Sequence, residues 1–133
     1  MKYIAIDLGL KRIGLAYSGY KDLVTPLPAI IRKNRKQASD EVRKAIKEWE
    51  VDAVVIGVPL GGSSEEEMKR RIDHFMNLVA FEGKIFYQDE AGTSLEAKNL
   101  MKSEIKSIRD GRIDSISAMI ILQRYLYRKK QEF

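Results

Sequence analysis

The N-terminal third of the chain alternates between apolar runs and short polar breaks, which is the pattern of β-strands joined by tight turns. A first apolar run begins at Tyr3 and reaches a carboxylate, Asp7, where the strand is expected to emerge. Residues 13–17 form a second apolar run, typical of the returning strand of a hairpin. Residues 23–31 contain two prolines, which restrict this third segment to an edge strand. The pattern predicts three consecutive antiparallel strands.

The rest of the chain alternates between helical and strand patterns. Apolar residues three or four positions apart predict amphipathic helices, and continuous β-branched runs predict buried strands. In chain order these segments are a helix with Ala38, Val42, Ile46 and Trp49, a strand over 53–58, a helix with Met68, Ile72, Phe75 and Val79 that ends at Gly83, a strand over 84–88, a short helix over 95–101 and a last helix over about 113–127. Trp49 is expected in the core. The last helix is expected to turn one face inward, formed by Ile116, Met119, Ile120 and Gln123.

This order of elements predicts an α/β fold. The first three strands form an antiparallel meander, and the later strand–helix repeats require parallel pairing with right-handed crossovers. The prediction is a five-stranded mixed sheet with helices on both faces. A chain of 133 residues fits one core, so we expect a single domain over 1–133.

Composition narrows the chemistry. The chain has no cysteine and one histidine, His74, so disulfides, thiolate metal sites and paired-histidine sites are excluded. Any metal must be held mainly by oxygen, which favours Mg²⁺ or Mn²⁺. The net charge of +5 is compatible with a polyanionic partner such as nucleic acid. No apolar run approaches the length of a membrane span and no signal peptide is evident, so we expect a soluble, cytoplasmic protein without a membrane partner.

The first hairpin turn has a composition suited to phosphate chemistry. Asp7 can hold a divalent cation, Gly9 allows the backbone to approach a ligand, and Lys11 and Arg12 can meet anionic oxygens. The same residues also suit an ordinary hairpin turn without a ligand. The turn alone does not decide between these interpretations.

Further carboxylates occur at the ends of other elements. Asp89 and Glu90 follow the last predicted strand, and Asp114 lies in the first turn of the last helix beside small residues. Ligands of such sheets bind outside the carboxyl ends of the strands, where Asp7 also lies. Clustered carboxylates repel one another unless a cation lies among them. The sequence therefore predicts an oxygen-ligand site for Mg²⁺ or Mn²⁺. Taken singly, each acid has a simpler explanation as a turn or helix-start residue.

Four motifs, in this order along nearly the whole chain, resemble those of the YqgF/RuvX family. They are Asp7-x-Gly9-x-Lys11-Arg12-x-Gly14, then Gly57-Val58-Pro59-Leu60 with Gly62-Ser63, then Asp89-Glu90 with Thr93-Ser94-x-Glu96-Ala97, and Gly111-Arg112-x-Asp114-x-x-Ser117-Ala118 with Ile121-Leu122-Gln123. Members are described as pre-16S rRNA nucleases or Holliday junction resolvases with a ribonuclease H-like fold.

The resemblance implies a metal-dependent nuclease. It implies that Asp7, Glu90 and Asp114 are the catalytic residues and hold the divalent metal, with Asp89 as the substitute for Glu90. It also implies that Lys11, Arg12, Thr93 and Arg112 contact phosphates of the substrate, beside the backbone of Gly9. One departure stands out: the family usually has an arginine after the Asp-Glu pair, where this chain has Ala91-Gly92.

Several functions follow as expectations. The first is an endonuclease on structured RNA, acting at the 5′ end of pre-16S rRNA, and the second is a resolvase of four-way DNA, which needs a homodimer rather than a monomer because it cuts two symmetric strands. A third is an RNA-binding ribosome-assembly factor without catalysis, which the Ala91-Gly92 departure keeps open. An actin-like ATPase is disfavoured, because that class closes two such domains on its nucleotide.

Overall fold

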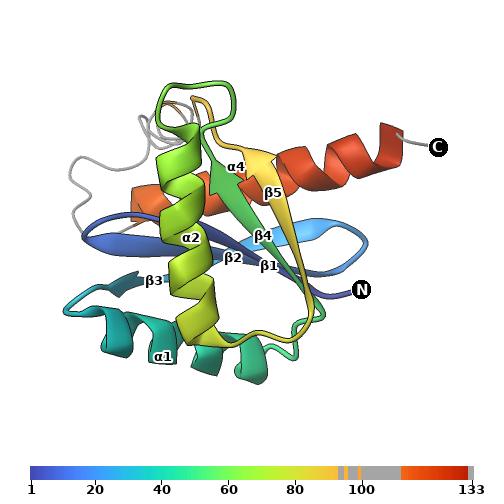
Figure 1. Ribbon diagram of the computed structural model, residues 1–133. Helices are drawn as coiled ribbons and strands as arrows, with labels where there is room; N and C mark the ends of the chain where they lie inside the picture. The colour runs from blue at the N-terminus through green and yellow to red at the C-terminus, as the bar shows by residue number, and fades with distance from the viewer. Residues whose placement is uncertain (93–94, 96–98, 100–111, 132–133) are drawn as a thin grey trace.

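The structure is a computed structural model that describes residues 1–92, 95, 99 and 112–131. The elements, in chain order, are β1 (Tyr3–Leu8), β2 (Arg12–Tyr20), β3 (Leu23–Ile31), α1 (Arg35–Glu48), β4 (Ala53–Val58), α2 (Glu65–Val79), β5 (Lys84–Asp89) and α4 (Arg112–Gln131). The expected helix over 95–101 lies largely outside the described residues. Figure 1 shows α1 and α2 on one face of the sheet and α4 on the other.

The sheet has five strands in the order β3-β2-β1-β4-β5. β1 pairs antiparallel with β2 and parallel with β4, and β4 pairs parallel with β5. The predicted mixed α/β sheet is therefore confirmed. β3 lies at the edge, as its two prolines require. Because β1, β4 and β5 run in the same direction, their carboxyl ends meet at one edge of the sheet (Figure 1).

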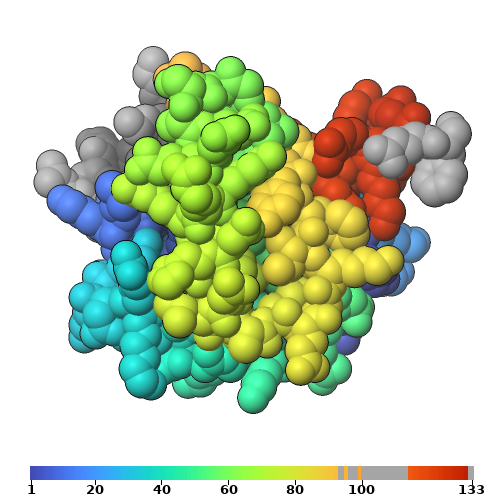
Figure 2. Space-filling view, viewed as in Figure 1, coloured from blue at the N-terminus to red at the C-terminus, as the bar shows by residue number. Residues whose placement is uncertain are grey.

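Two apolar layers hold the helices on the sheet. The larger one joins α1 and α2 to the face that carries Ile4, Ile6 and Ile56, and the smaller one joins α4 to the face that carries Ala5 and Val55. Every residue of β4 is buried, as expected of a central parallel strand. In the space-filling view of Figure 2, α2 and β5 cover the middle of the visible face.

Three local predictions were wrong. Trp49 is 38% exposed and packs on the ring of Tyr17, with ring centroids 4.6 Å apart, because it caps α1 at the surface. α2 ends at Ala80 in a left-handed conformation, before Gly83. The inner face of α4 is also different: it is formed by Ala118, Ile121, Leu122 and Tyr125 with Ile120, whereas Ile116 and Met119 are half-buried and Gln123 is exposed.

Among the described residues, no helix is long and apolar enough to cross a membrane.

Candidate active site

The β1–β2 turn presents the first carboxylate. Asp7 lies one residue before the end of β1, opposite Gly14 of β2. The amide of Gly9 donates to the carbonyls of Asp7 and Arg12, both at 3.1 Å, which closes the turn. The guanidinium of Arg32 donates to the Gly9 carbonyl at 2.7 Å and holds the turn from the β3 side. Lys11 is exposed at the tip of this turn.

The second carboxylate follows β5. The amide of Glu90 donates to the Val58 carbonyl at 3.0 Å, which continues the pairing with β4 by one step. Gly57 leaves the space for the Glu90 side chain, because a Cβ at position 57 would lie 2.9 Å from Glu90 Oε2 and 2.5 Å from Ile121 Cδ1. Asp89 instead accepts a hydrogen bond from the amide of Ala91 at 3.1 Å.

The third carboxylate, Asp114, lies in the first turn of α4. A Cβ at Gly14 would lie 1.9 Å from the carbonyl oxygen of Asp114, so only glycine lets the start of α4 approach β2 this closely. The buried hydroxyl of Ser115 donates to the Leu27 carbonyl at 2.6 Å and fixes the helix on β3. Asp114 forms an ion pair with Arg12, with Nε and Oδ2 3.0 Å apart and side chains 28% and 42% exposed.

The carboxylates perturb one another. Burial raises the pKa of Asp7 to about 7, and the negative charges of Glu90 and Asp114 and the hydrogen bond with Glu90 add to this rise. Burial also raises the pKa of Glu90; the hydrogen bond with Asp7 opposes that rise and the charge of Asp89 reinforces it. These opposite effects make Asp7 the proton donor of the pair and Glu90 the acceptor.

The site is rich in acidic oxygens but is not a closed metal cage. Within the described part of the chain, no three acidic or histidine side chains are already grouped around one point. The contacts explain this, since Asp114 is turned to Arg12 and the side chains of Asp7 and Glu90 are hydrogen-bonded to each other. The pKa of Asp7 is nevertheless raised by its burial and, to a smaller extent, by the negative charges of Glu90 and Asp114. A hard divalent cation would offset that charge, and the donors fit such an ion.

The structure places most of the residues singled out from the sequence. Asp7, Glu90, Asp114 and Arg12 are brought together, with Gly9 and Lys11 in the adjoining turn. Thr93 lies outside the described residues. Arg112 is the first residue of α4, and only its backbone is described.

Sequence reasoning missed residues that hold the backbone around the site in place or leave space for its side chains. Arg124 on α4 donates to the Ala91 carbonyl at 2.8 Å, directly after the Asp89-Glu90 pair. Arg32 holds the Gly9 carbonyl, and Gly57 and Gly14 leave the space described above. The glycines were visible within the family motifs, but nothing in the sequence links Arg124 or Arg32 to this edge of the sheet.

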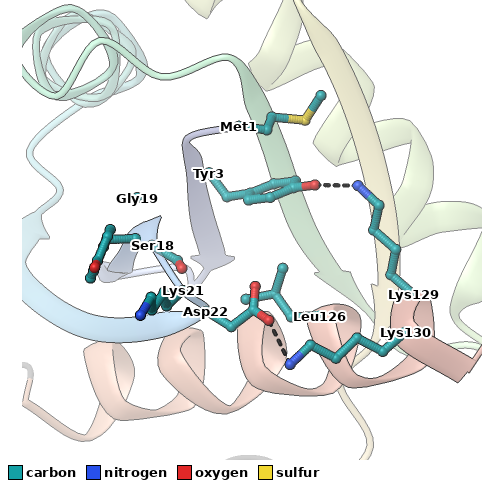
Figure 3. Close-up of a pocket in the computed structure, with 10 residues that line it drawn as sticks. Met1, Tyr3, Ser18, Gly19, Lys21, Asp22, Leu126, Lys129 and Lys130 are labelled. Atoms are coloured by element: carbon teal, nitrogen blue, oxygen red, sulfur yellow. Dashed lines mark hydrogen bonds and ion pairs between the residues drawn. The ribbon is translucent and has the colours of Figure 1, made fainter.

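A separate hollow of about 330 Å³ lies at the opposite end of β1. Figure 3 shows two of its three lysines engaged: Lys129 donates to the Tyr3 hydroxyl at 2.6 Å, and Lys130 pairs with Asp22 at 2.7 Å. The carboxylates are not among the residues that line it. This hollow is therefore distinct from the acidic site.

The mixed sheet and the helices on both of its faces define an α/β protein with a ribonuclease H-like fold. The chain belongs to the RuvX family: the family model, described as "Holliday junction resolvase", matches residues 1–128.

Its relatives are nucleases by name. A protein of Sulfurimonas denitrificans is 75% identical over 97% of this chain and 99% of its own length, and one of Sulfurovum sp. is 50% identical over 95% and 98%. Both bear the name "Putative pre-16S rRNA nuclease".

Solved structures share the fold at low sequence identity. RuvC of T. thermophilus, in complex with a Holliday junction substrate, matches with a TM-score of 0.61 at 12% identity, over 98% of this chain and 96% of that chain. The Fowlpox virus Holliday junction resolvase matches with a TM-score of 0.55 at 12% identity, over 97% and 99%. These likenesses confirm the predicted ribonuclease H-like fold.

Proposed function

We propose that this chain is a metal-dependent endonuclease that cleaves structured RNA at the 5′ end of pre-16S rRNA. The observation that carries the proposal is that the buried carboxyl of Asp7 interacts with both Glu90 and Asp114, which come from distant parts of the chain, with the pKa of Asp7 raised to about 7. The names of the relatives point to the substrate. Since rRNA precursors are made in the cytoplasm, we expect the protein there, acting through one domain over 1–133.

In this proposal Asp7, Glu90 and Asp114 hold Mg²⁺ or Mn²⁺, and Asp89 substitutes for Glu90 if the segment after β5 rotates. A divalent ion bound among carboxylates activates water and stabilises the leaving oxygen of a phosphodiester. The protein contributes by losing the Asp7 proton and by releasing Asp114 from Arg12. Arg12 is then available to a substrate phosphate, together with Lys11, Thr93, Arg112 and the backbone of Gly9.

A second candidate is a resolvase of four-way DNA junctions, which the description of the family model favours. A resolvase cuts two symmetric strands, so it has to act as a homodimer, whereas one active site on RNA suffices as a monomer. The molecular mass in solution, measured by light scattering with and without each substrate, separates these two modes.

The deciding experiment is cleavage of two labelled substrates, the 5′ leader of precursor 16S rRNA and a four-way DNA junction, with Mg²⁺ or Mn²⁺. We expect the wild type to cut the RNA leader at a fixed position. Asp7→Asn should lose cleavage because an amide cannot replace the anionic ligand. The matched control is Glu48→Gln, which also removes one negative charge but at an exposed site on α1.

Each outcome has a defined meaning. Preferred cleavage of the junction by a homodimer would replace the RNA proposal by the resolvase candidate. Tight RNA binding without cleavage by the wild type would contradict the enzyme proposal and favour an assembly factor without catalysis. Equal activity of the wild type and Asp7→Asn would remove the carboxylate site from the mechanism.

A further inference from the structure

An arginine-lined groove lies beside the β1–β2 turn, on the face of the sheet that α1 and α2 cover. It has a volume of about 690 Å³ and lies between the β1–β2 turn, the start of α1 and the outer surface of α2. We call it the arginine groove and define it by Gly9, Leu10, Arg32, Arg35, Arg70 and Arg71. Its three walls lie on the face seen in Figure 2, as the blue turn, the cyan start of α1 and the green α2.

The charge in this groove has one sign. Arg32, Arg35, Arg70 and Arg71 line it together with His74, and none of the described residues that line it is acidic. Arg71 is partly compensated by Glu67, 3.6 Å away on the same helix, in a pair exposed to solvent. Arg35 and Arg70 are exposed and form no ion pair with the described residues. Like charges gathered without carboxylates attract a polyanion.

One of these arginines is held in place before any ligand arrives. The guanidinium of Arg32 donates to the Gly9 carbonyl at 2.7 Å and lies 5.5 Å from the centre of the Phe75 ring. Burial and the neighbouring charge of Arg35 lower the pKa of Arg32, which marks positive charge without a compensating anion. A phosphate bound here would supply that anion.

The groove and the acidic site share the β1–β2 turn. The wall of the groove includes Leu8 and Gly9, which directly follow Asp7 in the chain. Asp7 faces the α4 side of the sheet, because side chains alternate along β1 and Ile6 and Leu8 face α1 and α2. A strand whose phosphate lies at the carboxylates therefore reaches the groove by passing over the β1–β2 turn at the edge of the sheet. Leu10 is 79% exposed at the rim, where an apolar side chain offers a contact to an unpaired base.

We propose that the arginine groove binds the single-stranded flank of the substrate RNA as it leaves the active site. Arg35 and Arg70 contact its phosphates from opposite walls, while Arg32 joins the groove to the catalytic turn. This inference rests on the proposed nuclease function, because it takes the substrate strand to lie at Asp7. It adds a substrate preference: the enzyme favours RNA that is unpaired beside the cleavage position.

The test measures binding in the absence of divalent metal, so that no cleavage occurs. Fluorescence anisotropy compares a structured leader RNA that has a flank of about ten unpaired nucleotides with the same RNA lacking the flank. Two versions place the flank on the 5′ or the 3′ side of the cleavage position. The groove variant is Arg35→Gln with Arg70→Gln, and the matched control is Lys44→Gln with Lys84→Gln, two exposed lysines outside the groove.

We expect the groove variant to bind one flanked RNA more weakly and the unflanked RNA normally. Each contact to a single-strand phosphate contributes about 0.7 to the slope of log affinity against log salt concentration. Losing two contacts therefore lowers the magnitude of that slope by about 1.4. Between 50 and 200 mM salt, the affinity of the variant should therefore fall about sevenfold less than that of the wild type. The control double variant should retain the wild-type preference for the flank.

Two results would overturn the groove proposal: equal losses in both double variants, which reports only net charge, or no difference between flanked and unflanked RNA. Failure of the nuclease proposal looks different. In that case the wild type binds flanked RNA through the groove but does not cut it when Mg²⁺ or Mn²⁺ is added. Thermal unfolding of both double variants shows whether they fold, and neither substitution removes a contact of the core.

Discussion

Asp7 is the residue whose surroundings conflict most with its charge. Its burial, and then the charges of Glu90 and Asp114 and the hydrogen bond with Glu90, raise its pKa from 3.8 to about 7. A carboxyl group that stays protonated near neutral pH is costly to ionise inside the fold. The same surroundings make a cation favourable, because a cation can replace the proton and offset all three acids at once.

Replacing Asp7 by Asn should change how stability depends on pH. Because the pKa of Asp7 in the folded state lies above its value in the unfolded state, its protonation stabilises the fold below about pH 4, and this stabilisation is lost as the pH rises through about 7. In EDTA at pH 8, the free energy of unfolding of Asp7→Asn should therefore be higher than that of the wild type by on the order of 4 kcal/mol. At pH 5 the difference should shrink to roughly 1.7 kcal/mol, because only part of the stabilisation has been lost there.

Urea unfolding at both pH values measures this, with Glu48→Gln as the control that keeps the wild-type profile. Parallel pH profiles for the wild type and Asp7→Asn would show that Asp7 titrates normally.

Replacing Arg12 by Ala should have opposite effects on metal and on substrate. Its ion pair with Asp114 must open before Asp114 can act as a metal ligand, so Arg12→Ala should lower the half-saturating metal concentration, by up to about fivefold for a partly exposed pair. KM for nucleic acid should rise, because a phosphate contact is lost.

Cleavage rates across metal and substrate titrations separate the two effects. Arg12→Lys, which keeps the charge, should lie between the wild type and Arg12→Ala in both titrations. A higher metal requirement in Arg12→Ala would mean that Arg12 orients Asp114 for the metal instead of competing with it.

At the scale of elements, the sequence predicted those features of the fold that local patterns determine. The strands follow from β-branched runs, and their direction brings the ends of β1 and β5 to one edge, so the meeting of Asp7 with Glu90 could be expected. The inner face of α4 could not be predicted, because apolar residues occur around most of this helix. Packing against the sheet decides which of them are buried. The hydrogen bond from Arg124 to the Ala91 carbonyl joins positions far apart in the chain, so no local sequence pattern could predict it.

The packing of α4 on β2 gives a prediction at this scale. Gly14→Ala adds a Cβ at 1.9 Å from the Asp114 carbonyl oxygen, and backbone atoms cannot move aside as a flexible side chain can. We expect a loss of roughly 1–3 kcal/mol in the free energy of unfolding and weaker metal binding, because the start of α4 is displaced.

Gly62→Ala is the matched control, since a Cβ there meets only the Pro59 carbonyl oxygen at 3.8 Å. Denaturant unfolding and metal titration of both variants make the comparison. An unchanged Gly14→Ala protein would mean that α4 does not pack on β2 as closely as the structure shows.

At the scale of the whole molecule, charge is separated along one edge of the sheet. The carboxylates gather at the ends of β1 and β5 on the α4 side, and the arginine groove begins at Leu8 on the opposite side of the β1–β2 turn. This arrangement attracts a polyanion to the groove and a cation to the acids, so a phosphate chain and a metal can occupy adjoining places. The position of the positive charge on the surface then matters more for binding than the net charge of +5 itself.

Metal binding should appear as a change in the stability of the whole fold. A ligand that binds only the folded state at a hundred times its Kd stabilises it by about 2.7 kcal/mol, which raises Tm by roughly 8–15 °C for a chain of this size. We expect this rise with Mn²⁺ at pH 8. It should be much smaller at pH 5, where protonated Asp7 weakens binding about a hundredfold.

Thermal unfolding of the wild type, Asp7→Asn and Glu48→Gln measures this rise in Tm. Only Asp7→Asn should lose the response, because Glu48 lies on α1 away from the carboxylates; an equal rise in all three would place the metal elsewhere on the molecule.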